Sequence, residues 1–137
     1  MLTLSQGVKL PLPEKRDEYH KHNATMDNIR KRIKSDEISK IINIEKQNRH
    51  IRNGEGYVEG RSYLYDGVNA QELVNIYHGT GEVKFTENGR WKNKEIITVN
   101  KNIGASINPM NGEAIPTNKF VIHYSKTGTH VVPTGRG

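Results

Sequence analysis

The 137-residue chain contains no cysteine, which excludes disulfide bonds, cysteine-ligated zinc and a thiol nucleophile. Hydrophobic residues are also few: they make up 33% of the chain, and the mean hydropathy is −0.79, so a single modest core is expected. No apolar run approaches the roughly 18 residues that a membrane-spanning helix needs. The opening stretch, residues 1–13, is too short and too polar for a signal peptide, so we expect a soluble chain without a membrane partner.

Basic residues exceed acidic ones in number. There are 21 lysines and arginines against 15 aspartates and glutamates, which gives a net charge of +6 and a pI near 9.6. Such a balance favours a polyanionic partner: a nucleic acid first, and an anionic membrane or an acidic protein second. A lysine-rich surface without a specific partner explains the same charge equally well, so composition alone leaves both interpretations open.

The first third of the chain predicts helices. Residues 1–13 contain two prolines and no periodicity, which is typical of a tail or a linker. From residue 14 to about residue 48 the chain lacks proline and glycine, and its apolar residues have helical spacing. Ser35 and Asp36 predict the cap of a second helix that continues through Ile44.

The remainder predicts one more helix and then strands. Asn69 and Glu72 form a capping box before the helical sequence QELVNIY, and Gly79 suits the position just after the helix. The predicted strands cover residues 83–85, 95–99, 103–107, 118–124 and 129–133, with a loop over 109–116. Helices followed by an antiparallel meander indicate an α+β fold, with N-terminal helices packed on a roughly four-stranded antiparallel sheet.

The last two strands carry polar side chains that suggest a site. Period 2 in NKFVIHY, residues 118–124, places Phe120 and its alternate neighbours on the core side. Lys119 and His123 then share the opposite face, and Ser125 continues their row. This hairpin sequence contains basic residues but no carboxylate.

The sequence leaves the register of this hairpin open. A bulged turn in SKTG pairs Ser125 with Thr129 and puts His130 opposite Tyr124, on the core side or at its rim. A tight two-residue loop instead pairs His123 directly with His130. Because a slip of one residue changes the face that a side chain occupies, the two registers predict different sites.

The hairpin histidines are candidates for acid–base catalysis. Most single histidines on strands are structural or merely exposed. Two of them beside Lys119, without a carboxylate, suit a site that receives a phosphate. Histidine has an unperturbed pKa of about 6.5, which allows acid and base chemistry near neutral pH. A neighbouring lysine or arginine stabilises the extra negative charge of a phosphorane-like transition state.

A second set of polar candidate residues lies in two stretches, QNRHIRNG at residues 47–54 and GRSYL at residues 60–64. His50 follows the predicted helix, and Arg61 follows a glycine. A loop histidine is a weak signal by itself. The other histidines are not expected to be catalytic. His20 and His22 lie in a charged helical segment and are expected to be solvated, while His78 suits a structural role at a helix C-terminus.

Metal chemistry has little support in the sequence. Acidic residues are isolated beyond Gly60, and the D-x-D, H-x-H and H-E-x-x-H patterns are absent, as are the glycine-rich fingerprints of phosphate-binding loops. We therefore expect neither a metal nor a cofactor. Metal-free cleavage of RNA needs less, because the 2′-hydroxyl of the substrate is the nucleophile and the protein supplies a base, an acid and cations. DNA lacks that hydroxyl, so the chemistry favours RNA.

Six stretches between residues 46 and 133 carry a resemblance: KQNRHIRNG, GRSYL, GTG, KEII, INPMNGEAIPT and KFVIHYSKTGTHVVP. Together they resemble the bacterial polymorphic toxin type 50 family. The resemblance implies a ribonuclease of the barnase, EndoU, colicin and RelE superfamily, found as the C-terminal domain of phage minor head proteins or of secreted toxins. In one departure, this chain has HIRNGEG where the family usually has HI-x-G-T after the first histidine.

Carried over position by position, the resemblance implies a polar site. Its catalytic candidates are His50, Arg61, Lys119, His123 and His130, and its substrate-binding candidates are Ser62, Thr117, Ser125, Lys126 and Thr129. We expect His50 and one hairpin histidine to form the acid–base pair. His123 is the first choice, because the bulged register places it on the face of Lys119, and His130 is the alternative if the loop is tight. The arginine and the lysine would neutralise the phosphate, and the hydroxyl groups would hydrogen-bond to it.

The sequence thus predicts a toxin domain over residues 46–137 that is a metal-independent endoribonuclease, preceded by a tail and helical segment over residues 1–45. RNA would be cleaved by attack of its 2′-hydroxyl, which leaves a 2′,3′-cyclic phosphate. We expect a cognate immunity protein as partner, a monomer when free, and action in the bacterial cytoplasm after delivery within a larger phage-borne or secreted protein. The alternative is a non-catalytic nucleic-acid-binding or protein-interaction module of a phage head protein, although no aromatic-rich strand face for base stacking is evident.

Overall fold

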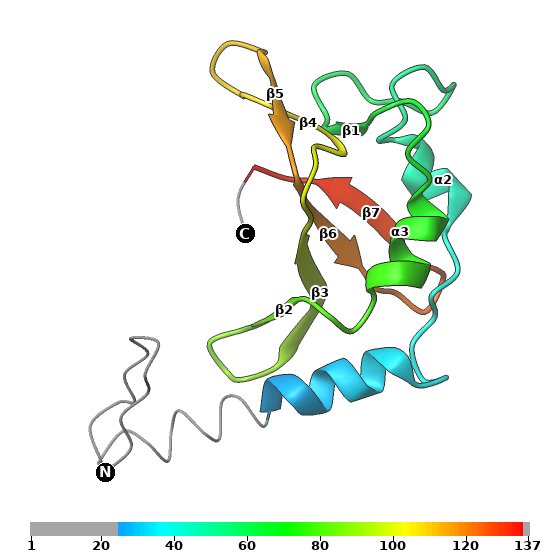
Figure 1. Cartoon of the computed structure of the whole chain (residues 1–137), viewed down its shortest axis with the longest axis vertical. Coiled ribbons are helices and arrows are strands. Elements are labelled where there is room, and N and C mark those ends of the chain that lie inside the picture. The colour runs from blue at the N-terminus through cyan, green and yellow to red at the C-terminus, as the bar shows by residue number, and fades with distance from the viewer. Residues whose placement is uncertain (1–24, 136–137) are drawn as a thin grey trace, which may run out of the picture.

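The computed structural model describes residues 25–135, which form helices and two antiparallel sheets (Figure 1). The predicted tail lies outside the described residues, as do His20 and His22, which the sequence predicts to be solvated. The first helix covers residues 25–34. It is followed by α2 (Ile44–Asn48), β1 (Tyr63–Leu64), α3 (Ala70–Tyr77), β2 (Glu82–Phe85), β3 (Trp91–Thr98), β4 (Gly104–Ile107), β5 (Ala114–Thr117), β6 (Lys119–His123) and β7 (His130–Pro133).

The larger sheet has four strands in the order β2-β3-β6-β7, and all neighbouring pairs are antiparallel. The predicted α+β fold with a four-stranded antiparallel sheet is therefore confirmed. A second sheet, β1-β4-β5, does not follow from the sequence patterns. Its strand β5 begins at Ala114, so the loop predicted over residues 109–116 is wrong. Because Ala114 and the two residues after it are exposed, no burial alternation marks this strand. The β4–β5 hairpin extends away from the larger sheet in Figure 1.

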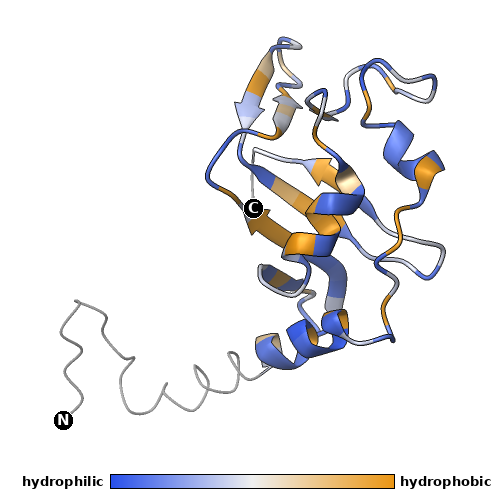
Figure 2. Cartoon of the chain, turned by 45° about the vertical axis from the view of Figure 1, so that its right-hand side comes forward, coloured by the Kyte–Doolittle hydropathy of each residue, from blue (hydrophilic) through white to orange (hydrophobic). Residues whose placement is uncertain are grey.

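The hydrophobic core lies on one face of the larger sheet. Alternation in β6 directs Phe120 and Ile122 to that face, where both are fully buried, as the sequence predicts. Leu73 and Val74 of α3 and Ile33 of the first helix belong to the same cluster. Figure 2 shows hydrophobic residues concentrated on the strands and on part of α3, while the first helix is largely hydrophilic. The first helix and α3 therefore cover the core face of the sheet.

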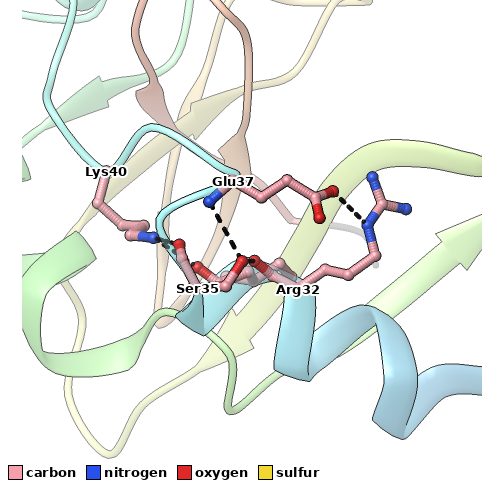
Figure 3. A network of polar contacts seen from close by, with 5 residues as sticks. Arg32, Ser35, Glu37 and Lys40 are labelled. Atoms are coloured by element: carbon pink, nitrogen blue, oxygen red, sulfur yellow. Dashed lines mark hydrogen bonds and ion pairs between the residues drawn. The ribbon is translucent and has the colours of Figure 1, made fainter.

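The first helix ends at a polar network instead of leading into a second helix. The Ser35 hydroxyl donates to Arg32 O (2.7 Å) and accepts from Glu37 N (3.2 Å), which satisfies backbone groups at the helix C-terminus. The Lys40 ammonium group donates to the Ser35 carbonyl oxygen, as Figure 3 shows. The helix predicted from Ser35 through residue 44 is therefore wrong, because Ser35 closes the preceding helix and the chain turns there.

The segment between the first helix and α2 holds the loop of the last hairpin. Thr129 N donates to Ile41 O (2.9 Å), the Thr129 hydroxyl donates to Ser39 O (2.7 Å), and Asn43 N donates to Thr129 O (2.8 Å). Residues before position 46 thus pack directly against the hairpin. The domain boundary predicted after residue 45 stays a prediction.

A buried carboxylate joins α3, β3 and β6. Glu95 of β3 is fully buried, and its oxygens accept hydrogen bonds from Gly79 N (3.0 Å), Gly81 N (2.8 Å) and Tyr124 Oη (2.7 Å). Burial and the nearby carboxylate raise the pKa of Tyr124, so its hydroxyl keeps the proton that it donates. Gly79 has a φ of 78° just after α3, which is the position where the sequence predicts the end of this helix.

Candidate active site

The last hairpin has the tight register. β6 and β7 pair with His123 opposite His130. Gly128 N donates to Ser125 O (3.2 Å) and closes the turn, and Gly128 has a φ of 108°, which favours glycine. The bulged register, with Ser125 opposite Thr129, is therefore wrong. Opposite residues of an antiparallel pair project to the same face, so the two histidines lie side by side.

Lys94 extends the two histidines into a row across three strands. It lies opposite His123 in the register of β3 and β6, and His123 lies opposite His130 in β7. The next residue along β3, Glu95, points into the core, so the row occupies the opposite face of the sheet. The hairpin face that the sequence predicts as polar is thus widened by a cation from a third strand.

The end of α2 brings a third histidine to this row. The Gln47 side chain forms two hydrogen bonds with the Val131 backbone: Nε2 donates to the carbonyl oxygen (2.9 Å), and the backbone N donates to Oε1 (2.6 Å). The amide thereby covers the free edge of β7. Three residues later, the His50 ring lies 6.0 Å from the His130 ring, centroid to centroid. The rings of His123 and His130 are stacked at 4.7 Å with 17° between their planes.

The backbone beyond Arg61 fixes the orientation of His50. His50 Nδ1 lies 2.8 Å from Ser62 O and 3.4 Å from Ser62 Oγ. Because a carbonyl oxygen only accepts hydrogen bonds, Nδ1 carries the proton, and Nε2 of the neutral ring keeps its lone pair. His50 is only 4% exposed, so this tautomer is held in a packed environment. The ring therefore offers one nitrogen, Nε2, as a proton acceptor.

Burial lowers the pKa of His50 below its ordinary value. The hydrogen bond to Ser62 O opposes this shift, while the positive charges of Arg61 and Arg49 add to it. The direction follows from the general rule that a buried imidazole surrounded by cations loses its proton more readily. His50 is therefore a neutral base near pH 7.

The hairpin histidines also have lowered pKa values. Burial lowers the pKa of His123 to about 4, with contributions from Lys94 and from the histidine after α2. The pKa of His130 is lowered to about 4 by burial first, then by the other two histidines and by Lys46 and Arg49. Every charged residue that perturbs the three imidazoles is thus a cation. Such a site attracts an anion, which would restore the balance of charge.

His130, the middle histidine of the cluster, has an unpaired polar atom. Its Nδ1 is buried and has no hydrogen-bond partner among the described residues. Buried polar atoms are nearly always hydrogen-bonded in folded proteins, because an unsatisfied one is unfavourable. The cluster is therefore less completely hydrogen-bonded than the buried site around Glu95.

Lys46 joins the cluster to the hairpin turn. Its Nζ donates to Ser125 Oγ (3.3 Å) and to Thr127 Oγ1 (3.1 Å). The same ammonium group lowers the pKa of His130. Ser125, a predicted substrate-binding residue, therefore lies within hydrogen-bond distance of a cation of the site. Lys126, another predicted residue, is exposed at the tip of the turn.

The remaining predicted residues lie apart from the histidines or have internal partners. Lys119 lies at the other end of β6, opposite Thr98, and is roughly 13 Å along the strand from His123 at about 3.3 Å per residue. The hydroxyl groups of Thr117 and Thr129 are buried and donate to backbone carbonyl oxygens, of Thr134 and Ser39 respectively. The roles predicted for them in substrate binding stay predictions.

Three cations of the site are not predicted from the sequence, namely Lys46, Arg49 and Lys94. Lys46 precedes His50 by four residues, the spacing at which side chains share one face of a helix, and this spacing is a signal that could have found it. Lys94 becomes a neighbour of His123 only through strand pairing. The sequence around Lys94 contains no local pattern that indicates this contact.

Metal ligation and membrane insertion receive no support from the described part of the chain. Within residues 25–135, no group of three or more histidine, cysteine, aspartate or glutamate side chains is arranged to hold a metal ion. None of the helices described is long and apolar enough to span a membrane. That the protein needs no metal and no cofactor stays a prediction.

A comparison with known protein families gives a match over most of the chain. Residues 42–133, more than half of the chain, match the model of the family described as bacterial toxin 50. The matched range includes the histidine cluster and its cations. No curated protein matches the chain at a significant level.

Proposed function

Because the chain belongs to the bacterial toxin 50 family, we propose that it is a toxin domain with metal-independent endoribonuclease activity. The observation that carries the proposal is the cluster of His50, His123 and His130, which two segments far apart in the sequence build together. Neutral imidazoles framed by cations suit the cleavage of a phosphodiester whose own 2′-hydroxyl is the nucleophile. RNA provides that hydroxyl and DNA does not.

His50 is the proposed general base. Its Nδ1 is committed to Ser62 O, so Nε2 is the atom that accepts the proton of the 2′-hydroxyl. The lowered pKa keeps this nitrogen unprotonated near neutral pH. The 2′-oxygen then attacks phosphorus as its proton moves to His50.

His123 is the proposed general acid. Its ring lies only 4.7 Å from that of His130, so a phosphate does not fit between these two rings. In-line displacement needs the base and the acid on opposite sides of phosphorus, and His50 and His123 are the outer members of the cluster. As the bond from phosphorus to the 5′-oxygen breaks, His123 protonates that oxygen. The products are a 2′,3′-cyclic phosphate and a 5′-hydroxyl.

The acid needs a proton that the free protein lacks at neutral pH. The pKa of His123 is about 4 when the site is empty of substrate. A bound phosphate raises the pKa of an adjacent imidazole, because opposite charge favours the protonated form. We therefore expect RNA binding to be accompanied by proton uptake.

The surrounding cations stabilise the negative charge of the transition state. Lys94 and Lys46 are the strongest candidates, because each lowers the pKa of a hairpin histidine and therefore acts at the cluster itself. Arg49 and Arg61 act on the side of the base. Lys119 lies farther along β6, so we assign it to a neighbouring phosphate of the RNA backbone instead of the cleaved one.

The proposal extends to partners and location. A ribonuclease toxin would damage the cell that makes it, which calls for a cognate immunity protein that covers the basic site. Its substrate, cellular RNA, places its action in the bacterial cytoplasm, after delivery as part of a larger phage-borne or secreted protein. We propose that the free domain is a monomer.

The direct test uses the purified full chain and single-stranded RNA in buffer with EDTA. We expect cleavage to continue in EDTA, with 2′,3′-cyclic phosphate and 5′-hydroxyl ends. A matched oligonucleotide with 2′-O-methyl groups throughout should remain intact, since it lacks the nucleophile. Absence of cleavage, or cleavage that requires added Mg²⁺ or Zn²⁺, would contradict the proposal.

A further inference from the structure

Three tyrosines and an arginine come together in the chain segment that follows His50. The Tyr63 ring lies 6.4 Å from the ring of Tyr57, edge to face, and 6.4 Å from the ring of Tyr65. The guanidinium of Arg52 lies over the Tyr63 ring, 4.9 Å from its centroid, and Arg52 Nη1 donates to Tyr63 Oη (3.1 Å). The three rings are half-buried and Arg52 is exposed, so the group forms part of the surface.

Two hollows flank this group, and both are lined by Arg52 and Tyr63. One has a volume of about 390 Å³ and also borders Tyr65 and Asp66. The other has a volume of about 340 Å³ and also borders Tyr57. A planar guanidinium on an aromatic ring between two hollows is suited to flat, uncharged ligands that stack.

Backbone contacts link the aromatic group to His50. Leu64 N donates to His50 O (3.0 Å), and Ser62 O accepts the hydrogen bond from the His50 ring. Tyr63 lies between these two contact residues, in β1. Arg52 follows the histidine by two positions. The same two backbone segments therefore position both the His50 ring and the aromatic group.

We propose that Arg52 and Tyr63 form a stacking site for a base of single-stranded RNA, on the His50 side of the cleaved phosphate; this inference rests on the proposed function. Every nucleobase has a π-face, so stacking on tyrosine and arginine tolerates many sequences. Asp66 lines one hollow and Glu59 the other, which disfavours a phosphate there and favours an uncharged base.

Tyr63 and Tyr65 form a short aromatic segment in the sequence, but nothing in the sequence places Tyr57 beside them. Tyr57 belongs to the turn-rich loop before β1, whereas Tyr63 is in β1 and Tyr65 follows it. Tyr57 is tied to this loop by a hydrogen bond from its hydroxyl to Arg61 O (2.6 Å). The loop thus places the Tyr57 ring beside the Tyr63 ring.

The test measures binding of a fully 2′-O-methylated single strand that contains 2-aminopurine, whose fluorescence falls when it stacks. Tyr63→Leu removes the ring and should weaken binding by roughly 5- to 150-fold, while Tyr63→Phe keeps the ring and should bind within about threefold of the unaltered chain. Lys101→Ala removes one exposed cation in the β3–β4 connection and shows how much a single surface charge contributes to binding by itself. Circular dichroism of each variant checks that it is folded.

The oligonucleotide cannot be cleaved by the proposed mechanism, so the test separates this inference from the proposed function. Loss of binding and of fluorescence quenching in Tyr63→Leu, with duplex RNA binding unchanged, supports the stacking site even if the protein cleaves no RNA. Equal affinity of Tyr63→Leu and the unaltered chain overturns the stacking site, even if cleavage is observed. A loss of binding in Tyr63→Phe equal to that in Tyr63→Leu also overturns it, because the aromatic ring would then not be what binds the base.

Discussion

Two polar sites lie back to back on β3 and β6, and they differ in how many of their polar atoms have hydrogen-bond partners within the chain. Glu95 and Tyr124 are on the core face, where the carboxylate accepts three hydrogen bonds from within the chain. One residue away on each strand, Lys94 and His123 are on the opposite face. There the half-buried rings of His123 and His130 have cations for neighbours, and His130 Nδ1 has no partner among the described residues.

This difference in hydrogen bonding distinguishes a structural site from a candidate functional site. Burial of a charge or a polar atom is tolerated where hydrogen bonds compensate it, as at Glu95. The histidine cluster lacks that compensation, which a phosphate would supply through charge and hydrogen bonds together. Changes at the two sites should therefore separate cleanly, with loss of activity at one and loss of stability at the other.

The largest effect is expected on removal of the base. His50→Ala should reduce the cleavage rate by about 10²–10⁴-fold, the usual range for general acid–base catalysis. His50→Asn should lose as much, because its amide can still donate to Ser62 O but cannot take a proton. His78→Ala is the control: the His78 ring bonds to Val74 O in the last turn of α3 and lies outside the cluster. Rates are measured on an RNA oligonucleotide under single-turnover conditions. Near-normal activity of His50→Asn would show that His50 only supports the structure.

The next largest effect is expected on stability, at the hydrogen-bonded site of Glu95. Glu95→Ala should lower the free energy of unfolding by about 2–4 kcal/mol, because two backbone N–H groups and a buried tyrosine hydroxyl lose their acceptor. Glu82→Ala should cost no more than about 0.5 kcal/mol, since Glu82 forms only an exposed ion pair with Lys84. Urea denaturation measures both. If Glu95→Ala unfolds at the same urea concentration as the unaltered chain, the buried carboxylate is not what holds α3 to the sheet.

The sequence predicts the fold where local chemistry decides it. Asn69 caps α3, with its side chain accepting from Glu72 N at 3.0 Å, and the helix ends before Gly79. The alternation in β6 is equally local. Ser35 is ambiguous by comparison, because serine satisfies backbone groups at either end of a helix, and here it closes one. The strand β5 leaves no hydrophobic pattern, because its residues before Thr117 are exposed and only the pairing with β4 forms it.

The candidate site follows the same rule. The three histidines are visible in the sequence because their residue type suggests their chemistry, and the polar face of β6 follows from period 2. The register that puts His123 opposite His130 depends on a turn that residues 39–43 hold from outside the hairpin. Lys94 enters through pairing with another strand. Contacts of this kind are long-range, and a single sequence contains no local record of them.

A smaller effect is expected from pH. The histidines of the cluster have lowered pKa values in the folded chain, about 4 for His123 and His130, against about 6.5 unfolded. Between these values the unfolded chain binds more protons, so the free energy of unfolding should fall as the pH falls from 6.5 towards 4. Each histidine contributes at most about 1.4 kcal/mol per pH unit, and less here because the rings are partly exposed.

Urea denaturation at pH 7 and pH 5 measures this loss. His130→Asn should make stability less dependent on pH, because it removes one group that must stay neutral in the folded state. His78→Ala should leave the pH dependence unchanged. An equal loss of stability at pH 5 in His130→Asn and in the unaltered chain would mean that His130 is not buried as a neutral imidazole.

The smallest effect separates two lysines on the same face of the sheet. Lys94 lies opposite His123, while Lys119 lies at the far end of β6. Lys94→Ala should lower kcat/KM by about tenfold, mainly through kcat, because it removes a charge beside the acid. Lys119→Ala should cost only about threefold, mainly through KM, and should reduce the slope of log affinity against log salt by about 0.7, as for one phosphate contact on a single strand.

The two variants carry the same change in net charge, so equal losses would indicate a diffuse electrostatic effect. A second measurement sharpens the distinction. Because Lys94 lowers the pKa of His123, its removal should raise that pKa towards 6.5, whereas Lys119→Ala should leave it unchanged. The imidazole proton signals of His123 in an NMR titration report this value directly. A pKa of His123 that stays near 4 in Lys94→Ala would remove Lys94 from the site and leave burial and His50 as the causes of the lowered value.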